Sequence, residues 1–539
     1  MPRKRQPRWL WAAVGCLLIA LGILAPRTAL AEGGTTPEPP EVSTADHTRF
    51  PSLQGPFKNA MEVTQACLKC HNEAADQVMH TIHWSWEYQD PVSGATLGKK
   101  HDVNNFCISV TSNWARCTSC HAGYGWKNND FDFQDAARVD CLVCHDTTGR
   151  YKKFPAGAGL PVSEPKEFPP GSGKIWQPPD LANIAQHVGK SSRTNCGACH
   201  FYGGGGDGVK HGDMDSSLAA PPKTVDVHMS PEGANMTCAD CHAEPAHQMG
   251  GSRYDGHPAD THGKDLPVND GNPATCQSCH GNAPMQEAKL NDHVDKVACQ
   301  TCHIPAFARG GKPTKMWWDW SKAGDKGRGT HGVEKDEHGW VTYHFMKGEF
   351  VWQENVVPTY AWSNGYLGFT VEGEKVMPEE GVVYINRPHG SPDEADARIY
   401  PFKAFRGRQA YDPVNQLLIV PHLFPFNKED TTAYWKGFDW EKAFEVGMKT
   451  AALPYSGKYE WVETKMYWPI THMVAPAEQA VQCGECHARE SRLAGIGGVY
   501  IPGRDYNRAL DAVGWALAIL ALAGVVVHGG LRLAAAKKS

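Results

Sequence analysis

The pentapeptide Cys-x-x-Cys-His occurs eight times in this chain of 539 residues, and no other feature constrains the fold as strongly. The chain has 18 cysteines, and 16 of them lie in these pentapeptides. Two thiols three positions apart, followed directly by a histidine, suit a c-type haem: the thiols form thioethers and the imidazole binds the iron. The eight pentapeptides are CLKCH (67–71), CTSCH (117–121), CLVCH (141–145), CGACH (196–200), CADCH (238–242), CQSCH (276–280), CQTCH (299–303) and CGECH (483–487).

The sequence therefore predicts eight covalently bound c-type haems. Structural disulfides are the alternative expected of an exported protein, but they do not require a histidine after every cysteine pair. The predicted attachment cysteines are Cys67, Cys70, Cys117, Cys120, Cys141, Cys144, Cys196, Cys199, Cys238, Cys241, Cys276, Cys279, Cys299, Cys302, Cys483 and Cys486. The predicted proximal iron ligands are His71, His121, His145, His200, His242, His280, His303 and His487.

Of the 26 histidines, 18 lie outside these motifs and are available as distal ligands. Two of them, His293 and His472, precede a haem motif by a short segment, which favours a role beside a neighbouring haem. Any single histidine is also compatible with a surface position. As a set, the predicted distal ligands are His83, His211, His228, His247, His293 and His472.

Seven of the eight motifs are crowded between Cys67 and His303, so the predicted haems must touch or nearly touch. The chain is rich in glycine (55) and proline (38), and long amphipathic patterns are scarce. We expect a mainly α fold with extensive loops, organised around a packed haem array, plus one C-terminal transmembrane helix. The predicted parts are a signal peptide (1–31), a haem-rich body (32–303), a haem-free covering lobe (304–481), the eighth motif with a linker (482–507) and an anchor with a basic tail (508–539).

Both ends of the chain point to export. A basic start, an apolar run over 9–24 and the small-x-small pattern Ala29–Ala31 predict a cleaved signal peptide. The apolar segment 512–531 is long enough to cross a bilayer, and the basic residues over 532–538 place its end in the cytoplasm. The body is therefore predicted to lie in the periplasm, anchored to the cytoplasmic (inner) membrane. The net charge of −6, without blocks of like charge, gives no indication of nucleic-acid binding.

One cysteine of the exported body belongs to no motif. Cys107 lies in HDVNNFCISV (101–110), whereas the other unassigned cysteine, Cys16, lies in the predicted signal peptide. A free cysteine is often a small buried apolar residue. In an exported chain with no partner thiol, a functional thiol is the alternative that we favour.

The sequence resembles the octahaem tetrathionate reductases over nearly all of the body, from STADHTRF (43–50) to the last haem motif. The resemblance rests on long matches in loops around the haem motifs. They are VNNFC (103–107), RCTSCHAGYGWK (116–127), VDCLVCHDTTG (139–149), CGACHFYGGGGDGVKHGD (196–213), CQTCHIPAFARGG (299–311) and THMVAP (471–476).

The resemblance implies seven haems with two histidine ligands and one unusual haem on the second motif. That haem would have His121 as proximal ligand and a lysine as distal ligand, with Asn104 and Cys107 beside it. Lys190 is the first choice for this lysine. The family places an aspartate near the lysine, and Asp180 is the candidate for it. The spacing Asp-x-x-Lys would require a lysine at position 183, where this chain has Asn183. The other candidate lysines are Lys152 and Lys153.

The function that this resemblance implies is that of a periplasmic reductase of a small oxyanion, with tetrathionate as the first substrate. A lysine amine can leave the iron for substrate, and a thiolate can attack a sulfur–sulfur bond by exchange. Electrons would come from a quinol-oxidising membrane cytochrome or a small periplasmic cytochrome. The alternatives are reduction of nitrite or hydroxylamine, oxidation of hydroxylamine, and a non-catalytic conduit between the quinol pool and periplasmic acceptors.

Overall fold

The computed structural model describes residues 45–242, 245–255, 274–281 and 283–537. The chain divides into two units, Met1–Asp46 and His47–Ser539, and the helices and strands named here belong to the second unit. The predicted signal peptide and Cys16 lie outside the described residues. The division into five parts stays a prediction.

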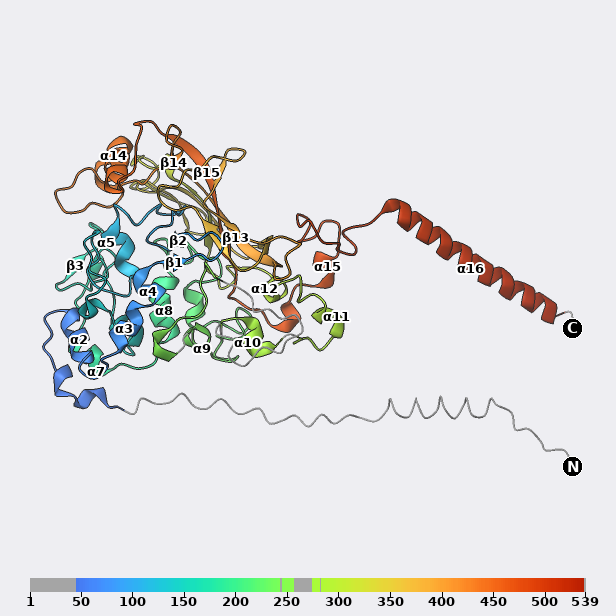
Figure 1. Cartoon of the computed structure of the whole chain (residues 1–539), viewed down its shortest axis with the longest axis horizontal. Coiled ribbons are helices and arrows are strands. Elements are labelled where there is room, and N and C mark those ends of the chain that lie inside the picture. Colours follow the sequence, from blue (N-terminus) through green and yellow to red (C-terminus); the bar gives the residue numbers. More distant parts are fainter. Residues whose placement is uncertain (1–44, 243–244, 256–273, 282, 538–539) are drawn as a thin grey trace, which may run out of the picture. The chain divides into compact units, whose positions relative to one another are not determined.

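Short helices separated by long loops carry the haem motifs (Figure 1), and every motif overlaps one of these helices. Cysteines three positions apart lie on one side of a helical turn, so a single turn suffices to present both thiols. The α-helices are α2 (Ala60–Cys67), α3 (Ala74–Met79), α4 (Ile82–Ser85), α5 (Trp114–Cys117), α6 (Leu142–His145), α7 (Leu181–Gln186), α8 (Arg193–His200), α9 (Ala239–His242), α10 (Cys276–His280), α11 (Ala288–Asn291), α12 (Cys299–His303), α13 (Tyr434–Gly437), α14 (Trp440–Thr450), α15 (Cys483–Cys486) and α16 (Arg508–Ala536).

The fourth motif shows how such a helix begins. The Ser192 side chain accepts a hydrogen bond from the backbone N–H of Asn195, and the Asn195 side chain accepts one from the backbone N–H of Ser192. This reciprocal capping box satisfies two backbone donors at the start of α8. Local capping therefore fixes where the turn that carries Cys196 and Cys199 begins.

A nine-stranded sheet occupies the part of the chain predicted to be a haem-free lobe. Its strand order is β11-β15-β13-β5-β8-β7-β6, with β9 and β14 also paired with β13. Most pairs are antiparallel, but β5 runs parallel to β13 and β11 runs parallel to β15. The strands of this sheet are β5 (Thr314–Asp319), β6 (Val333–Lys335), β7 (Val341–His344), β8 (Gly348–Gln353), β9 (Thr359–Ser363), β11 (Val382–Tyr384), β13 (Arg398–Asp412), β14 (Leu417–Leu418) and β15 (Glu460–Pro469).

Three small antiparallel pairs lie outside this sheet. They are β1 (Tyr88–Gln89) with β2 (Thr96–Leu97), β3 (Lys166–Glu167) with β4 (Ile175–Trp176), and β10 (Leu367–Phe369) with β12 (Asn386–Pro388).

The largest apolar cluster joins the sheet to the segment before the second haem motif. Trp318 on β5, Phe405 on β13 and Trp468 on β15 are fully buried in it. Phe106 and Ile108 belong to the same cluster, and Cys107 packs against it. Because burial of large aromatic side chains contributes strongly to stability, this packing holds the Cys107 loop against a rigid sheet.

The mainly α part of the fold prediction is not confirmed, because 28% of the chain is helical and 18% lies in strands. The long strand β13 is buried on both faces over most of its length, so its sequence lacks a clear two-residue alternation. That pattern explains why this sheet was missed.

The helix α16 contains the predicted transmembrane segment 512–531. Within the part of the chain that the structure describes, it is the one helix with the length and composition to cross a membrane. The Asn507 side chain caps it by accepting hydrogen bonds from the backbone N–H groups of Ala509 and Leu510. A chain segment of this kind can serve as an anchor.

Candidate functional site

Six of the eight motif histidines face a second imidazole ring. A metal–nitrogen bond of about 2 Å on each side of an iron, together with the ring radii, places two ligand rings about 6 Å apart. The facing pairs and their centroid separations are His47–His71 (6.3 Å), His83–His200 (6.0 Å), His145–His247 (6.2 Å), His228–His280 (6.0 Å), His242–His472 (6.1 Å) and His293–His487 (6.0 Å). The residues of these six sites therefore fit iron with two histidine ligands.

Backbone carbonyls orient several of the motif imidazoles. Nδ1 of His145 lies 2.9 Å from Gly189 O, and His242 and His487 make the same contact with Gly250 O and Pro502 O. A carbonyl oxygen only accepts, so Nδ1 carries the proton and Nε2 keeps its lone pair for a metal.

Five of the six predicted distal histidines lie opposite a motif histidine, at about 6 Å in each case. The exception is His211, whose ring lies 5.0 Å from Trp468 and faces no motif imidazole among the described residues. We correct that prediction. His47, which was not predicted, lies opposite His71. His47 precedes Cys67 by 20 residues, whereas His293 and His472 precede their motifs by 6 and 11, so its distance from the motif gave no signal. Its place in STADHTRF (43–50), where the resemblance begins, was the available signal.

Cysteine thiols of different motifs lie beside one another. Hydrogen bonds link Cys67 with Cys141, Cys120 with Cys199, Cys196 with Cys238 and Cys276 with Cys299. Each bond joins two different motifs, so the attachment sites are close neighbours. This arrangement agrees with the closely packed haem array expected from the sequence.

His121 of the second motif differs from the paired histidines. Its fully buried ring lies in a box of aromatic rings, with the centroids of Trp84 and Trp126 both 5.0 Å away. It faces no imidazole within the described ranges, and its Nε2 lies 2.7 Å from Trp84 O. Binding of iron by Nε2 requires this hydrogen bond to break. Burial lowers the pKa of His121 to about 3, so the ring is neutral.

His303 also faces no imidazole among the residues that the structure describes. Two further histidines, His257 and His262, lie outside those residues. The second and seventh motifs are thus the two for which the structure gives no histidine pair.

Cys107 lies beside the second motif in a tight loop that Asn104 holds together. Asn104 Oδ1 accepts hydrogen bonds from the backbone N–H groups of Phe106, Cys107 and Ile108, at 3.2, 2.8 and 3.0 Å. Its Nδ2 donates to Ile108 O at 3.0 Å. Both ends of the side chain are therefore engaged within the loop, and Asn104 positions Cys107.

The surroundings of Cys107 are apolar and positively charged. Burial raises the pKa of the Cys107 thiol, and the charges of Lys347, Arg116, Lys315 and Lys99 oppose that rise. Burial and the proximity of Cys107 raise the pKa of Cys117 to about 12. A thiol next to four cationic side chains is placed to act on an anion.

The predicted pair Lys190 and Asp180 lies elsewhere. Lys190 is exposed and follows Gly189, which hydrogen-bonds to His145 of the third motif. Asp180 caps the exposed start of α7 by accepting from the backbone N–H of Asn183 at 3.0 Å. No contact given by the structure connects either residue with the second motif, so we replace this assignment.

The two other lysines named from the sequence are also accounted for. Lys152 is exposed. Lys153 donates to His121 O, and its Nζ lies 3.0 Å from Asp140 Oδ2 in a nearly buried ion pair. An ammonium group held by a carboxylate has no lone pair with which to bind a metal.

Lys210, which was not among the lysines named from the sequence, lies near the second motif. Burial, with the charges of Arg253 and Lys99, lowers its pKa well below the usual value, and the charge of Cys120 in the second motif acts on it. Its Nζ lies 4.8 Å from the Trp468 ring centroid and forms no ion pair with a described residue. Asp207 stands three positions earlier, which is the Asp-x-x-Lys spacing sought around Asp180. The signal was present in FYGGGGDGVKHGD (201–213).

A fully buried lysine, Lys403, holds the backbone of the half-buried Lys210 in place. Lys403 on β13 is fully buried, and its Nζ donates to Val209 O at 2.9 Å, Lys210 O at 3.1 Å and Thr314 Oγ1 at 2.6 Å. Three acceptors satisfy the three ammonium donors. The sheet thereby fixes the loop that presents Lys210.

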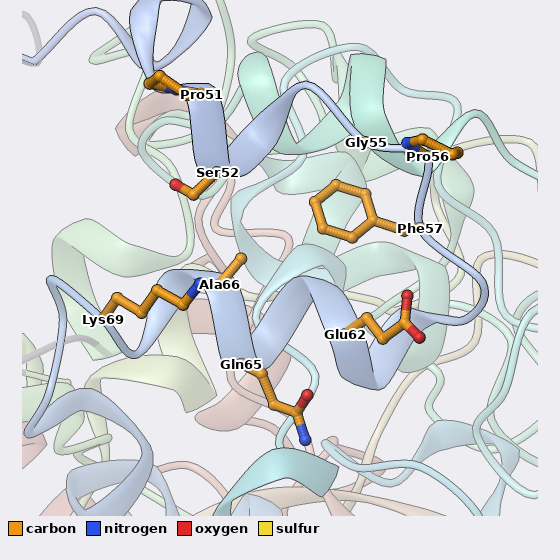
Figure 2. Close-up of a pocket in the computed structure, with 9 residues that line it drawn as sticks. All are labelled: Pro51, Ser52, Gly55, Pro56, Phe57, Glu62, Gln65, Ala66 and Lys69. Carbon is orange, nitrogen blue, oxygen red and sulfur yellow. The ribbon is translucent and has the colours of Figure 1, made fainter.

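A hollow of about 310 Å³ lies at a different place, beside the first motif. Figure 2 shows Phe57 across it, between α2 and the loop that carries Gly55 and Pro56. Neither Cys107 nor Lys210 lines this hollow. It therefore belongs to the surroundings of the first motif.

The chain is similar to known cytochromes of the c type. A family model described as bacterial cytochrome c matches residues 315–490. The chain is similar to an octahaem cytochrome c from Shewanella oneidensis with a known crystal structure, at 43% identity and a TM-score of 0.72, over 83% of this chain and 95% of that one. It is also 23% identical, over 278 residues, to an uncharacterised protein of Archaeoglobus fulgidus, covering 44% of this chain and 92% of that protein.

Replacement of Lys403 by Met is predicted to alter the spectrum of one haem in the purified, haem-loaded protein. The carbonyls of Val209 and Lys210 lose their donor, which costs about 1–3 kcal/mol for each unsatisfied group and releases the loop. Electron paramagnetic resonance of the oxidised protein measures the change. Lys465→Met on β15 is the control and should leave the spectrum unchanged. A Lys403→Met spectrum identical to wild type would contradict the positioning role.

Proposed function

Because this chain belongs to the octahaem tetrathionate reductase family of multihaem c-type cytochromes, we propose that it is a membrane-anchored periplasmic reductase of a small oxyanion, tetrathionate first. The observation that carries this proposal is an asymmetry. Six motif histidines face a second imidazole, whereas the second motif has Lys210 and the free Cys107 nearby.

Bound c-type haems supply electrons, and a haem whose outer ligand can leave supplies an open coordination site. The residues of this chain supply the remaining functions. The half-buried Lys210 amine would be the residue that holds the iron at the second motif, since burial lowers its pKa well below the usual value and it forms no ion pair with a described residue. The six facing histidine pairs would hold six of the other seven sites without an open position.

Cys107 is proposed as the nucleophile. The Cys107 thiol first loses its proton to solvent. Its Sγ then attacks one central sulfur of tetrathionate, which forms the adduct Sγ–S–SO₃⁻ on Cys107 and expels the other half as thiosulfate. Two electrons from a reduced cytochrome or a quinol-oxidising partner then cleave the bond between Sγ of Cys107 and the attached sulfur. This step restores the thiolate and releases the second thiosulfate, so atoms and electrons balance.

The position of α16 supports the anchored, periplasmic location. The likeness to a c-type cytochrome implies a place outside the cytoplasm, and the length and composition of α16 suit a membrane anchor. Pro502, six residues before α16 begins, accepts a hydrogen bond from His487 of the eighth motif. Of the eight haem motifs, the eighth is therefore the one nearest in sequence to the proposed anchor. We propose that a membrane electron donor reaches the haem of this motif.

Replacement of Cys107 by Ala or Ser is predicted to lower tetrathionate turnover at least a hundredfold, because the nucleophile is lost. Turnover is measured with an artificial electron donor, and haem content by absorbance. Ser keeps the size of Cys, so it separates loss of the thiol from loss of packing. Turnover near wild type in either variant, at full haem content, would rule out the thiol role.

Ending the chain at Asn507 is predicted to release the protein from the membrane. The full chain should sediment with membranes and dissolve only in detergent, because α16 buries its apolar side chains in lipid. The shortened chain should appear in the soluble periplasmic fraction with unchanged haem content. Fractionation followed by haem staining measures both, and a full-length chain that is soluble without detergent would argue against the anchor.

A further inference from the structure

Two lysines on the sheet side of Cys107 have no counter-ion. Lys315 lies on β5, and Lys347 lies in the turn just before β8, which pairs with β5. Lys315 is only 5% exposed. Neither lysine forms an ion pair or a side-chain hydrogen bond with a residue in the described part of the chain.

Aromatic rings compensate only part of the cost of burying Lys315. Its Nζ lies 3.2 Å from the ring centroid of Phe350 and 3.9 Å from that of Trp318. The Trp352 ring centroid lies 5.0 Å from the same Nζ. Such cation–π contacts are favourable, but ring faces are weaker partners for an ammonium group than oxygen acceptors are. Burial lowers the pKa of Lys315 well below its usual value, and an anion beside the amine would hold its proton and supply the missing acceptors.

Both lysines lie near enough to Cys107 for their charges to act on it. Their charges act on the Cys107 thiol, and Cys107 packs against the cluster that contains Trp318 and Phe350. Trp318 Nε1 also donates to Lys347 O at 2.7 Å, which ties the Lys347 turn to the same cluster. The two lysine side chains and the thiol therefore border the same apolar cluster.

A second pair of lysines, Lys99 and Lys210, lies near the second motif. Lys99 Nζ donates to Cys117 O at 3.1 Å, and the charge of Lys99 acts on both Cys107 and Lys210. The glycine-rich loop lies between the two groups. A Cβ on Gly205 would lie 3.8 Å from Lys347 Nζ, and one on Gly203 would lie 3.0 Å from Lys210 Cδ.

We propose that Lys315 and Lys347 form a second anion subsite, which binds the far end of a linear dianion whose near end lies at the second haem motif. The ligand class is an anion with a sulfonate-like charge at each end and its reactive bond beside Cys107. For the end of the dianion that lies at the second haem motif, this proposal rests on the proposed reductase function. It gives a physical reason why a two-ended anion would bind better than nitrite, which has one charge, or hydroxylamine, which has none.

The test is the rate at which Cys107 is alkylated in the haem-loaded, full-length protein. Iodoacetate is an anion and iodoacetamide is neutral, so the ratio of their rate constants reports the positive charge near the thiol. Lys315→Met, Lys347→Met and the double variant are compared with wild type, with site-resolved mass spectrometry as the readout. We expect the ratio to fall about tenfold in the double variant.

Lys322→Met is the matched control, since Lys322 is an exposed lysine just after β5 and should leave the ratio unchanged. Haem content and the absorbance spectrum verify that each variant is folded. An unchanged ratio in the double variant would overturn the proposal and assign both lysines to a fixed internal anion, such as a carboxylate of the prosthetic group.

Protection by thiosulfate gives a second measurement. Thiosulfate is a dianion that resembles half of the proposed ligand, and it should slow iodoacetamide alkylation of wild-type Cys107. This protection should weaken about tenfold in Lys315→Met and Lys347→Met, and equal protection in all proteins would contradict the subsite. Neither measurement uses tetrathionate turnover, so failure of the proposed reductase activity is distinguishable from failure of the subsite.

Discussion

The separation of about 6 Å between facing imidazole rings is the constraint on which the rest of this structure depends. Six such pairs bring together segments from different parts of the chain, for example His83 with His200 and His242 with His472. A second polar contact fixes the ring in several pairs, as Asp213 does for His472 at 3.0 Å. The many short helices and long loops follow from this requirement, because each ligand must approach from its own direction.

The sheet gives the site a different kind of support. Its strands bury Trp318 and Phe405 against the Cys107 loop, and Lys403 on β13 holds the loop of Lys210. Residues on a packed sheet are positioned more precisely than residues on a free loop. The segment that looked like a cover for the haem motifs therefore supplies one wall of the proposed reaction site, and the bacterial cytochrome c model matches this same segment.

The attachment motifs were predictable because all their residues are adjacent in the sequence. Pairing of ligands is not local in the sequence, and two histidines show the consequence. His47 was not predicted as a distal ligand although it faces His71, and His211 was predicted as one although its ring packs beside Trp468. The surroundings of a lysine are equally non-local. Lys190 and Lys210 look alike in the sequence, but Lys210 alone contacts Lys403 and Trp468. Both partners lie far along the chain, so the sequence around Lys210 does not reveal them. The role of Cys107 followed from the count of cysteines and from family resemblance, and its cationic surroundings emerged only from the fold.

The most direct test of the central claim is near-infrared magnetic circular dichroism of the oxidised, haem-loaded protein, in which the charge-transfer band depends on the axial ligands. The account predicts one band distinct from the bis-histidine bands, which disappears in Lys210→Met and persists in Lys153→Met. A spectrum in which every haem has two histidine ligands, unchanged by the Lys210 substitution, would contradict the account and favour a protein that only conducts electrons.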